Sequence, residues 1–135
     1  MNLQDQVLKG YPSAKKILSN PNCYFLEKKR YLVFWESLIA KASVNEILCF
    51  LQNETKDQSF SKWKTLIVVG KTDEHFEKKD LFYFDNDSTF VVFLLLNEKN
   101  KNVFMNDSWI FVLGCNFKKH VRKISKIIQQ TANIQ

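Results

Sequence analysis

Phenylalanine and glycine occur in an unusual ratio in this chain, twelve against three. Glycine lets a backbone turn tightly around a phosphate or adopt positive φ, and Gly10, Gly70 and Gly114 each stand alone. Neither of the common glycine-rich nucleotide-binding loops can therefore be written on this sequence. Phenylalanine supplies large buried area, so the composition favours a packed core and an interacting surface over a reactive pocket.

The bulk composition is that of an ordinary globular domain. A length of 135 residues, 45% hydrophobic and 25% charged, predicts a single domain over 1–135. The first residues contain no apolar signal region, and the longest apolar run, Phe90 to Leu96, is far shorter than a membrane span of roughly 20 residues. Cys23, Cys49 and Cys115 are odd in number and widely spaced, which favours free thiols in a reducing cytoplasm.

The net charge of +6 is unevenly distributed along the chain. The segment from Asn116 to Gln135 contains five bases and no acid. The segment from Asp73 to Asp87 contains six acids and two lysines. Because a partner responds to the local field, this polarity predicts two surfaces of opposite sign.

The first half of the chain predicts helices around a hairpin. Apolar spacing predicts helix over 3–18, interrupted at Gly10-Tyr11-Pro12. Aromatic runs at 23–26 and 31–35 flank a charged stretch and predict a hairpin, with a helix over 31–42 as the alternative. Ser43 and Glu46 form a capping-box pattern that predicts a helix to about residue 53.

The second half predicts a sheet followed by a helix. The run 66–69 predicts a buried strand that ends at Gly70, and two Asn-Asp-Ser turns predict an antiparallel meander with strands at 81–84, 89–96, 102–105 and 109–113. Asn116 is expected to cap a final helix whose apolar stripe packs on the sheet; the stripe is Phe117, Val121, Ile124 and Ile128. The fold class is therefore α+β, with N-terminal helices, a mainly antiparallel sheet and a C-terminal amphipathic helix.

Residue patterns for catalysis or metal binding are weak. Cys115 and His120 are five residues apart, a spacing that matches no known nucleophile and base pattern, and the other histidine, His75, has no partner motif. Four turn aspartates were considered as cation ligands, but solvated turn carboxylates explain them better: Asp80, Asp85, Asp87 and Asp107. The sequence thus predicts neither catalytic residues nor a metal or other cofactor.

Two surfaces are candidates for binding. The acidic one mixes carboxylates with an aromatic anchor, as protein interfaces do, and comprises Asp73, Glu74, Phe76, Glu77, Asp80, Asp85 and Asp87. The basic one lies on the final helix, where phosphate contacts would use Lys118, Lys119, Arg122, Lys123 and Lys126.

The last fifty residues carry a family resemblance. A predicted meander that turns into an amphipathic helix opening with an aromatic, here Asn116-Phe117-Lys118-Lys119-His120-Val121, is similar to the closing segment of SUKH-type bacterial immunity proteins. That resemblance implies a small α+β cytosolic protein that binds and blocks a cognate toxin, often a nuclease. We therefore expect a non-catalytic protein-binding module, most simply a toxin-neutralising immunity protein. The alternative is a nucleic-acid-binding protein that uses the basic C-terminal helix.

Overall fold

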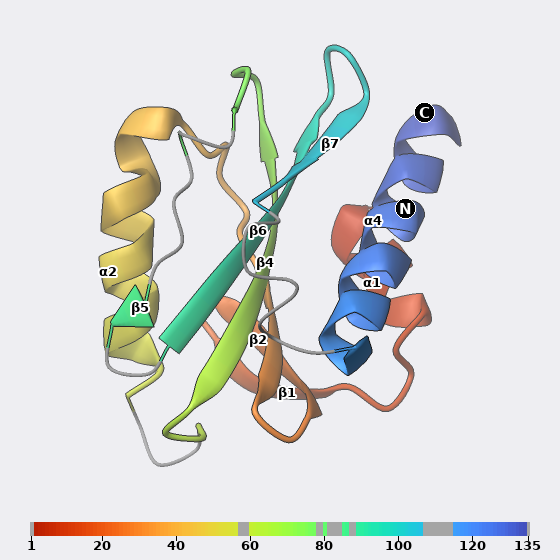
Figure 1. The fold of residues 1–135 in the computed structure, drawn as a ribbon. Helices are drawn as coiled ribbons and strands as arrows, with labels where there is room; N and C mark the ends of the chain where they lie inside the picture. Colours follow the sequence, from red (N-terminus) through yellow and green to blue (C-terminus); the bar gives the residue numbers. More distant parts are fainter. Residues whose placement is uncertain are drawn as a thin grey trace.

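The computed structural model describes residues 2–56, 60–77, 80, 85–86, 89–106 and 115–134. These residues form helices on both sides of one mixed sheet (Figure 1). The helices are α1 (Leu3–Lys9), the 3-10 helix η1 (Lys41–Ser43), α2 (Val44–Glu54) and α4 (Cys115–Ile134). The strands are β1 (Lys15–Ser19), β2 (Asn22–Glu27), β3 (Arg30–Phe34), β4 (Lys64–Thr72), β5 (Asp85–Asn86), β6 (Thr89–Asn97) and β7 (Asn102–Met105).

The strand order is β1-β2-β3-β4-β6-β5, and β7 also pairs with β6. The pairs β1–β2, β2–β3, β5–β6 and β6–β7 are antiparallel. The pairs β3–β4 and β4–β6 are parallel, with Arg30 opposite Thr65 and Lys64 opposite Thr89. The three central strands therefore start at one edge of the sheet and end at the opposite edge.

These two edges organise the rest of the molecule. We define the amino edge as residues 14–16, 27–30, 62–64 and 118–123. The carboxyl edge comprises residues 35–41, 71–77, 80 and 97–102. Helix α4 runs beside the sheet from the amino edge at the bottom of Figure 1 to the carboxyl edge at the top.

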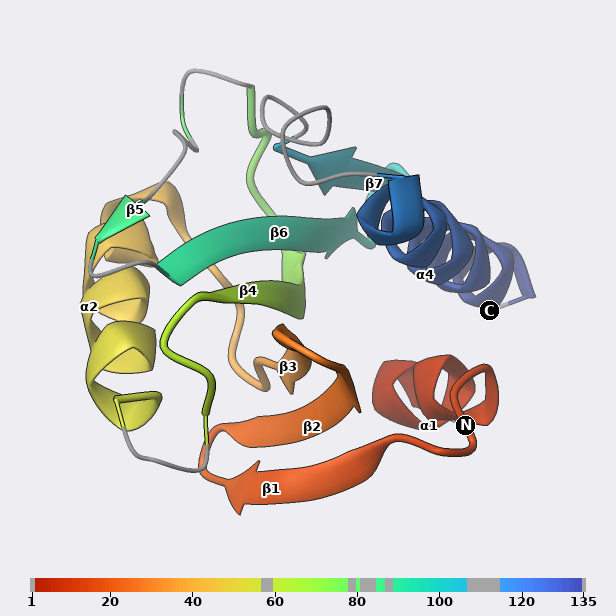
Figure 2. The same ribbon diagram turned by 60° about the horizontal axis from the view of Figure 1, so that its bottom comes forward.

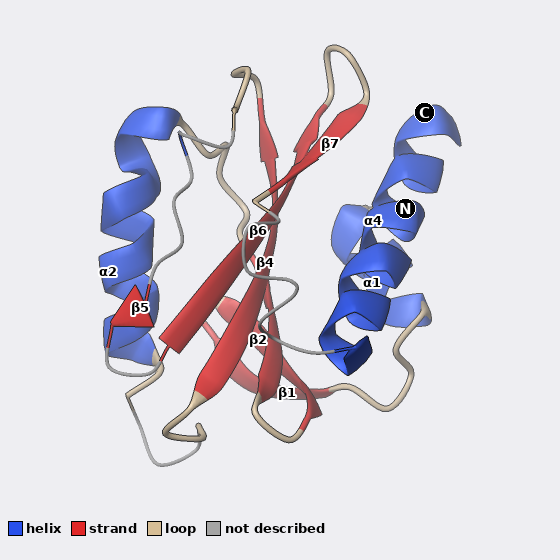
Figure 3. Ribbon diagram, viewed as in Figure 1, coloured by secondary structure: helices blue, strands red, loops and turns tan. Residues whose placement is uncertain are grey.

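Helices cover both faces of the sheet, α2 on one side and α1 with α4 on the other (Figures 2 and 3). Alternate residues of the central strands serve the two cores: in β4, Leu66 and Val68 face α2, whereas Ile67 and Val69 face α1 and α4. Burial on both faces explains why these strands read as continuous apolar runs.

The predicted fold class, α+β, is confirmed. The hairpin forms as expected around the Lys28–Lys29 turn, and helix 44–54 and strand 89–97 lie close to their predicted positions. The final helix packs its stripe on the sheet, with Val121, Ile124 and Ile128 each 1% exposed or less. It begins at Cys115, so Asn116 lies inside its first turn and not at the cap. The Phe117 side chain lies outside the described residues.

Two topological predictions were wrong. The second half of the N-terminal helix is strand β1, because residues 15–19 pair with β2 after the Pro12 break. The centre of the sheet is parallel rather than a meander, because α2 carries the chain back across the sheet before β4 begins. The predicted strands 81–84 and 109–113 lie outside the described residues.

Two local predictions were also wrong. Strand β4 continues past Gly70 to Thr72, and a Cβ atom at Gly70 would lie 2.7 Å from Ile39 Cδ1, so glycine there admits a packed side chain. Ser43 does not cap α2 through its side chain; its Oγ donates to the Ala40 carbonyl oxygen at 2.8 Å.

Candidate functional site

The carboxyl edge gathers the loops that follow three parallel strands. In open sheets with parallel strands, ligands commonly bind where the strands end. Backbone bonds tie two of these loops together: the Ile39 amide donates to the Lys71 carbonyl oxygen at 2.8 Å. Segments 35–41 and 71–77 therefore form one continuous surface.

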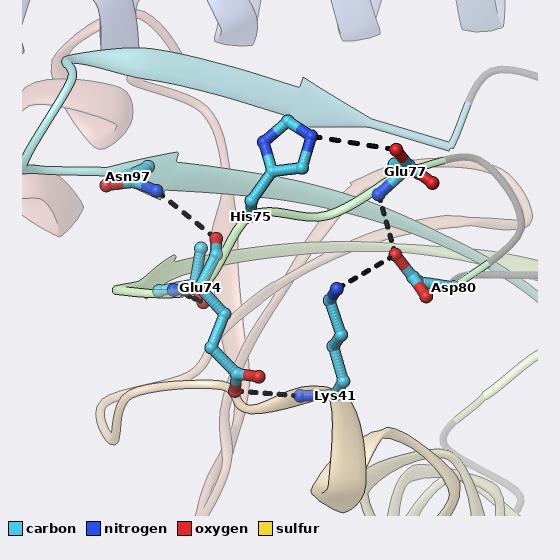
Figure 4. A network of polar contacts seen from close by, with 7 residues as sticks. Lys41, Glu74, His75, Glu77, Asp80 and Asn97 are labelled. Atoms are coloured by element: carbon cyan, nitrogen blue, oxygen red, sulfur yellow. Dashed lines mark hydrogen bonds and ion pairs between the residues drawn. The ribbon is translucent and has the colours of Figure 1, made fainter.

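Part of the predicted acidic surface forms a connected network at this edge (Figure 4). The Lys41 amide donates to Glu74 Oε2 at 3.0 Å, and Lys41 Nζ lies 3.3 Å from Asp80 Oδ2. The same Asp80 oxygen accepts from the Glu77 amide at 2.8 Å. Asn97 Nδ2 donates to the Glu74 carbonyl oxygen at 3.2 Å, which attaches the network to the end of β6. These contacts fix the positions of Glu74 and Asp80 before any partner arrives.

The remaining acids of segment 71–77 face solvent. Asp73 and Glu77 are exposed, and His75 Nε2 lies 3.9 Å from Glu77 Oε1. Across the described carboxyl edge, six acids stand against four lysines, two of which are held in ion pairs, Lys41 with Asp80 and Lys71 with Glu98. The edge is therefore acidic, but less so than the sequence segment alone predicts.

Phe76 does not serve as a surface anchor. Its ring is 5% exposed and packs against Phe104 with centroids 5.8 Å apart, as part of the core under α2. The exposed apolar side chain at this edge is Leu38, which is 58% exposed. Its chain neighbour Ile39 is fully buried and holds the loop down. A lone leucine next to a buried isoleucine reads as core in the sequence, so Leu38 was missed.

Asp85 lies away from the other predicted acids. Strand β5 pairs with the start of β6, with Asp85 opposite Phe90, whereas Thr72 pairs with Asn97 at the other end. Seven residues of strand separate these levels, about 23 Å at a strand rise of about 3.3 Å. The contiguous surface predicted over 73–87 is therefore split between the two edges. Asp87 lies outside the described residues.

The predicted basic residues occupy the first half of α4, at and next to the amino edge. Lys119, Arg122, Lys123 and Lys126 are exposed and Lys118 is half-buried. Other cations join them from distant segments: Lys15 and Lys16 on β1, the Lys28–Arg30 turn, and Lys62 with Lys64 at the start of β4. Of the described amino-edge residues, eleven are cations and one, Glu27, is an acid.

A polar chain fastens α4 to this edge. The Tyr11 hydroxyl lies 2.9 Å from His120 Nδ1, and His120 Nε2 lies 3.0 Å from Glu27 Oε1. Arg30 Nε lies 3.1 Å from the same Glu27 oxygen. Burial, with a smaller contribution from Glu27, raises the pKa of Tyr11 to about 12. A phenol held in its neutral form and a histidine bonded at both nitrogens indicate a structural clamp. The clamp was missed because its members lie 93 and 109 positions apart in the sequence.

The Cys115 and His120 pairing considered from the sequence has no described geometry, because the Cys115 side chain lies outside the described residues. Cys23 is fully buried, and burial raises the pKa of its thiol to about 12, so it is not activated as a nucleophile. Among the described residues, no three His, Cys, Asp or Glu side chains group as a metal site. The Asp107 proposed as a cation ligand falls outside them.

A depression of about 350 Å³ lies at the carboxyl edge between β4 and the β6–β7 hairpin. Its amide side chains bond to nearby loops: Asn100 Oδ1 accepts from the Asn102 amide at 3.0 Å, and Gln129 Nε2 donates to the Lys101 carbonyl oxygen at 2.7 Å. These amides organise the loops of the carboxyl edge and give it a polar, hydrogen-bonding floor.

None of the described helices is both long and apolar enough to cross a membrane. No protein-family model, curated protein or solved structure matches the chain. The two charged edges are therefore the observations from which function has to be argued.

Proposed function

We propose that this protein is a non-catalytic binding module whose carboxyl edge binds a basic protein partner. The observation that carries the proposal is the combination at that edge of exposed Leu38 with carboxylates from neighbouring loops. Interfaces concentrate binding energy in a few apolar or aromatic anchors that a polar rim surrounds. Leu38 supplies the anchor, and Asp73 and Glu77 supply the charged rim.

The bonded network favours recognition because it is rigid. Glu74 and Asp80 are held by Lys41, so a partner does not have to order them on binding. Preorganised side chains reduce the entropic cost of association. Exposed acids at the rim steer a basic partner and raise its rate of association.

The simplest biological form of this proposal is an immunity protein that acts in the cytoplasm and neutralises a cognate toxin. A nuclease is the toxin class that fits best, because its nucleic-acid-binding surface is basic and complements acidic side chains. The resemblance of the closing segment to SUKH-type proteins supports the same reading.

The test is coexpression of the full chain with the protein encoded by the adjacent open reading frame. We expect a stable complex and relief of that protein's toxicity. Recovery of the chain without the neighbouring protein, together with unrelieved toxicity, contradicts the immunity role.

Two variants then locate the surface on the purified complex. Glu77→Lys should slow association by up to about tenfold at low salt, because it reverses a rim charge. Leu38→Ala should speed dissociation and weaken binding by about fivefold or more, as truncation of an anchor does. Glu54→Lys makes the same charge change at the far end of α2 and should leave the association rate unchanged. Equal effects of Glu54→Lys and Glu77→Lys would place the interface elsewhere.

A further inference from the structure

The amino edge combines a dense positive charge with an exposed aromatic ring. Its described residues contain eleven cations and a single acid, and that acid, Glu27, already contacts His120 and Arg30. Trp63 is 54% exposed and lies directly before β4. A large exposed indole on a lysine-rich surface is a costly arrangement in a protein that does not use it.

Trp63 lies among lysines in space as well as in sequence. Lys62 precedes it and Lys64 follows it. The β2–β3 turn is next to it, because the Thr65 amide donates to the Lys29 carbonyl oxygen at 2.8 Å. Lys28 and Lys29 are both exposed at the tip of that turn. An aromatic platform is thus flanked by cations from two neighbouring loops.

Helix α4 contributes charge where helix stability opposes it. The amino end of a helix carries a partial positive charge, which favours acids and disfavours cations in the first turn. The first turn of α4 contains no acid, and Lys118 and Lys119 lie within its first five residues. Local rules of stability are typically broken at functional sites. These lysines therefore add to the evidence for an anionic ligand at this edge.

We propose that the amino edge binds single-stranded nucleic acid, with Trp63 stacking on a base and the surrounding lysines contacting phosphates. Stacking requires an unpaired base with a free face, which a duplex does not offer along its length. The cations track a phosphate backbone without base-specific contacts, so binding should depend little on sequence. This proposal does not rest on the protein-binding role of the carboxyl edge, which lies at the opposite end of the sheet.

The experiment measures fluorescence anisotropy of a labelled oligothymidylate of about 20 nucleotides titrated with the full chain. We expect saturable binding that is tighter than binding to a duplex of the same length and that weakens as salt rises from about 50 to about 200 mM. Trp63→Ala should weaken single-strand binding by about 5- to 100-fold and leave duplex binding nearly unchanged. Quenching of tryptophan emission by the oligonucleotide should be lost in Trp63→Phe, a readout that does not depend on the alanine variant folding well.

A matched pair of variants separates the local surface from net charge. Lys28→Gln with Lys29→Gln removes two exposed lysines from a hairpin turn and includes one residue with φ of 68°. Lys99→Gln with Lys101→Gln does the same in the β6–β7 turn, where Lys101 has φ of 58°. The first pair should reduce the salt slope of single-strand binding by about 1.4, and the second should not change it.

Several results overturn the proposal. Single-strand affinity that survives Trp63→Ala excludes the stacking role. Equal affinity for single strand and duplex shows a general electrostatic surface. Equal weakening by the two lysine pairs attributes binding to net charge alone. Competition by polyglutamate at the same charge concentration, as effective as the oligonucleotide, assigns the edge to an acidic protein.

Discussion

The packing of Gly70 against Ile39 leads to a quantitative prediction about the loop that presents Leu38. A Cβ atom at Gly70 would lie 2.7 Å from Ile39 Cδ1, closer than van der Waals contact allows. Ile39 is fully buried, so its side chain has no free space into which to rotate. Overpacking of this kind costs about 1–3 kcal/mol. Alanine gains about 0.5–1 kcal/mol over glycine within a strand, so Gly70→Ala should lower the free energy of unfolding by about 1–2 kcal/mol.

Ile39→Val provides the matching test because it deletes the Cδ1 atom involved. On its own, Ile39→Val should cost about 0.5–1.5 kcal/mol. In that background the nearest remaining atoms, Ile39 Cγ1 and Leu95 Cδ2, are 3.6 Å from the alanine Cβ position, which is ordinary contact. Gly70→Ala should then be neutral or stabilising by up to about 1 kcal/mol.

Urea unfolding of the four proteins measures the coupling between the two positions. We expect a coupling free energy of at least about 1 kcal/mol, as for residues in direct contact. An equal cost of Gly70→Ala in both backgrounds would refute the idea that Ile39 requires glycine at this point of β4. The m-value should stay constant, since neither change alters the surface exposed on unfolding.

Three further predictions concern buried polar groups. Asn106→Ala should destabilise by about 1–3 kcal/mol in urea unfolding, because the buried Asn106 Oδ1 accepts from the Phe93 amide at 2.7 Å; a neutral effect would contradict that bond. The pKa of Tyr11 is raised from 10.0 to about 12, so its contribution to stability is complete below pH 10 and is lost as pH rises toward 12. Tyr11→Phe should therefore show a smaller loss of stability over that pH range, and identical pH curves would contradict this. In the native protein, a thiol reagent should modify exposed Cys49 well before buried Cys23, as mass spectrometry of the labelled peptides can show; early labelling of Cys23 would contradict its burial.

Elements specified by local pattern were predictable from the sequence. The charged turn between two aromatic runs defined the β2–β3 hairpin, and the stripe through Val121, Ile124 and Ile128 defined the buried face of α4. Strand β1 was not predictable, because Ile17 and Leu18 fit helical spacing equally well and only pairing with β2 decides between the two. Parallel pairing at the centre also escaped prediction, since nothing in a strand's own sequence states its direction relative to a distant neighbour.

The candidate surfaces were predicted in part. The acids that follow β4 do form a network, because they are close in sequence and lie on one loop. Asp85 was grouped with them wrongly, since strand pairing carries it to the other edge. Leu38 and Trp63 were missed because an exposed apolar residue looks like a core residue until burial is known. The amino edge was missed as a unit because its cations come from four separate segments.

Helix α4 also fixes how far apart the two edges lie. Its 20 residues span about 30 Å at a rise of about 1.5 Å per residue. Charges in physiological salt are screened over about 8 Å, so a molecule seated at one end does not feel the charge of a molecule seated at the other. A chain that held both ligands would therefore act as a stiff spacer, and it would join them without letting either one alter the affinity for the other through electrostatics.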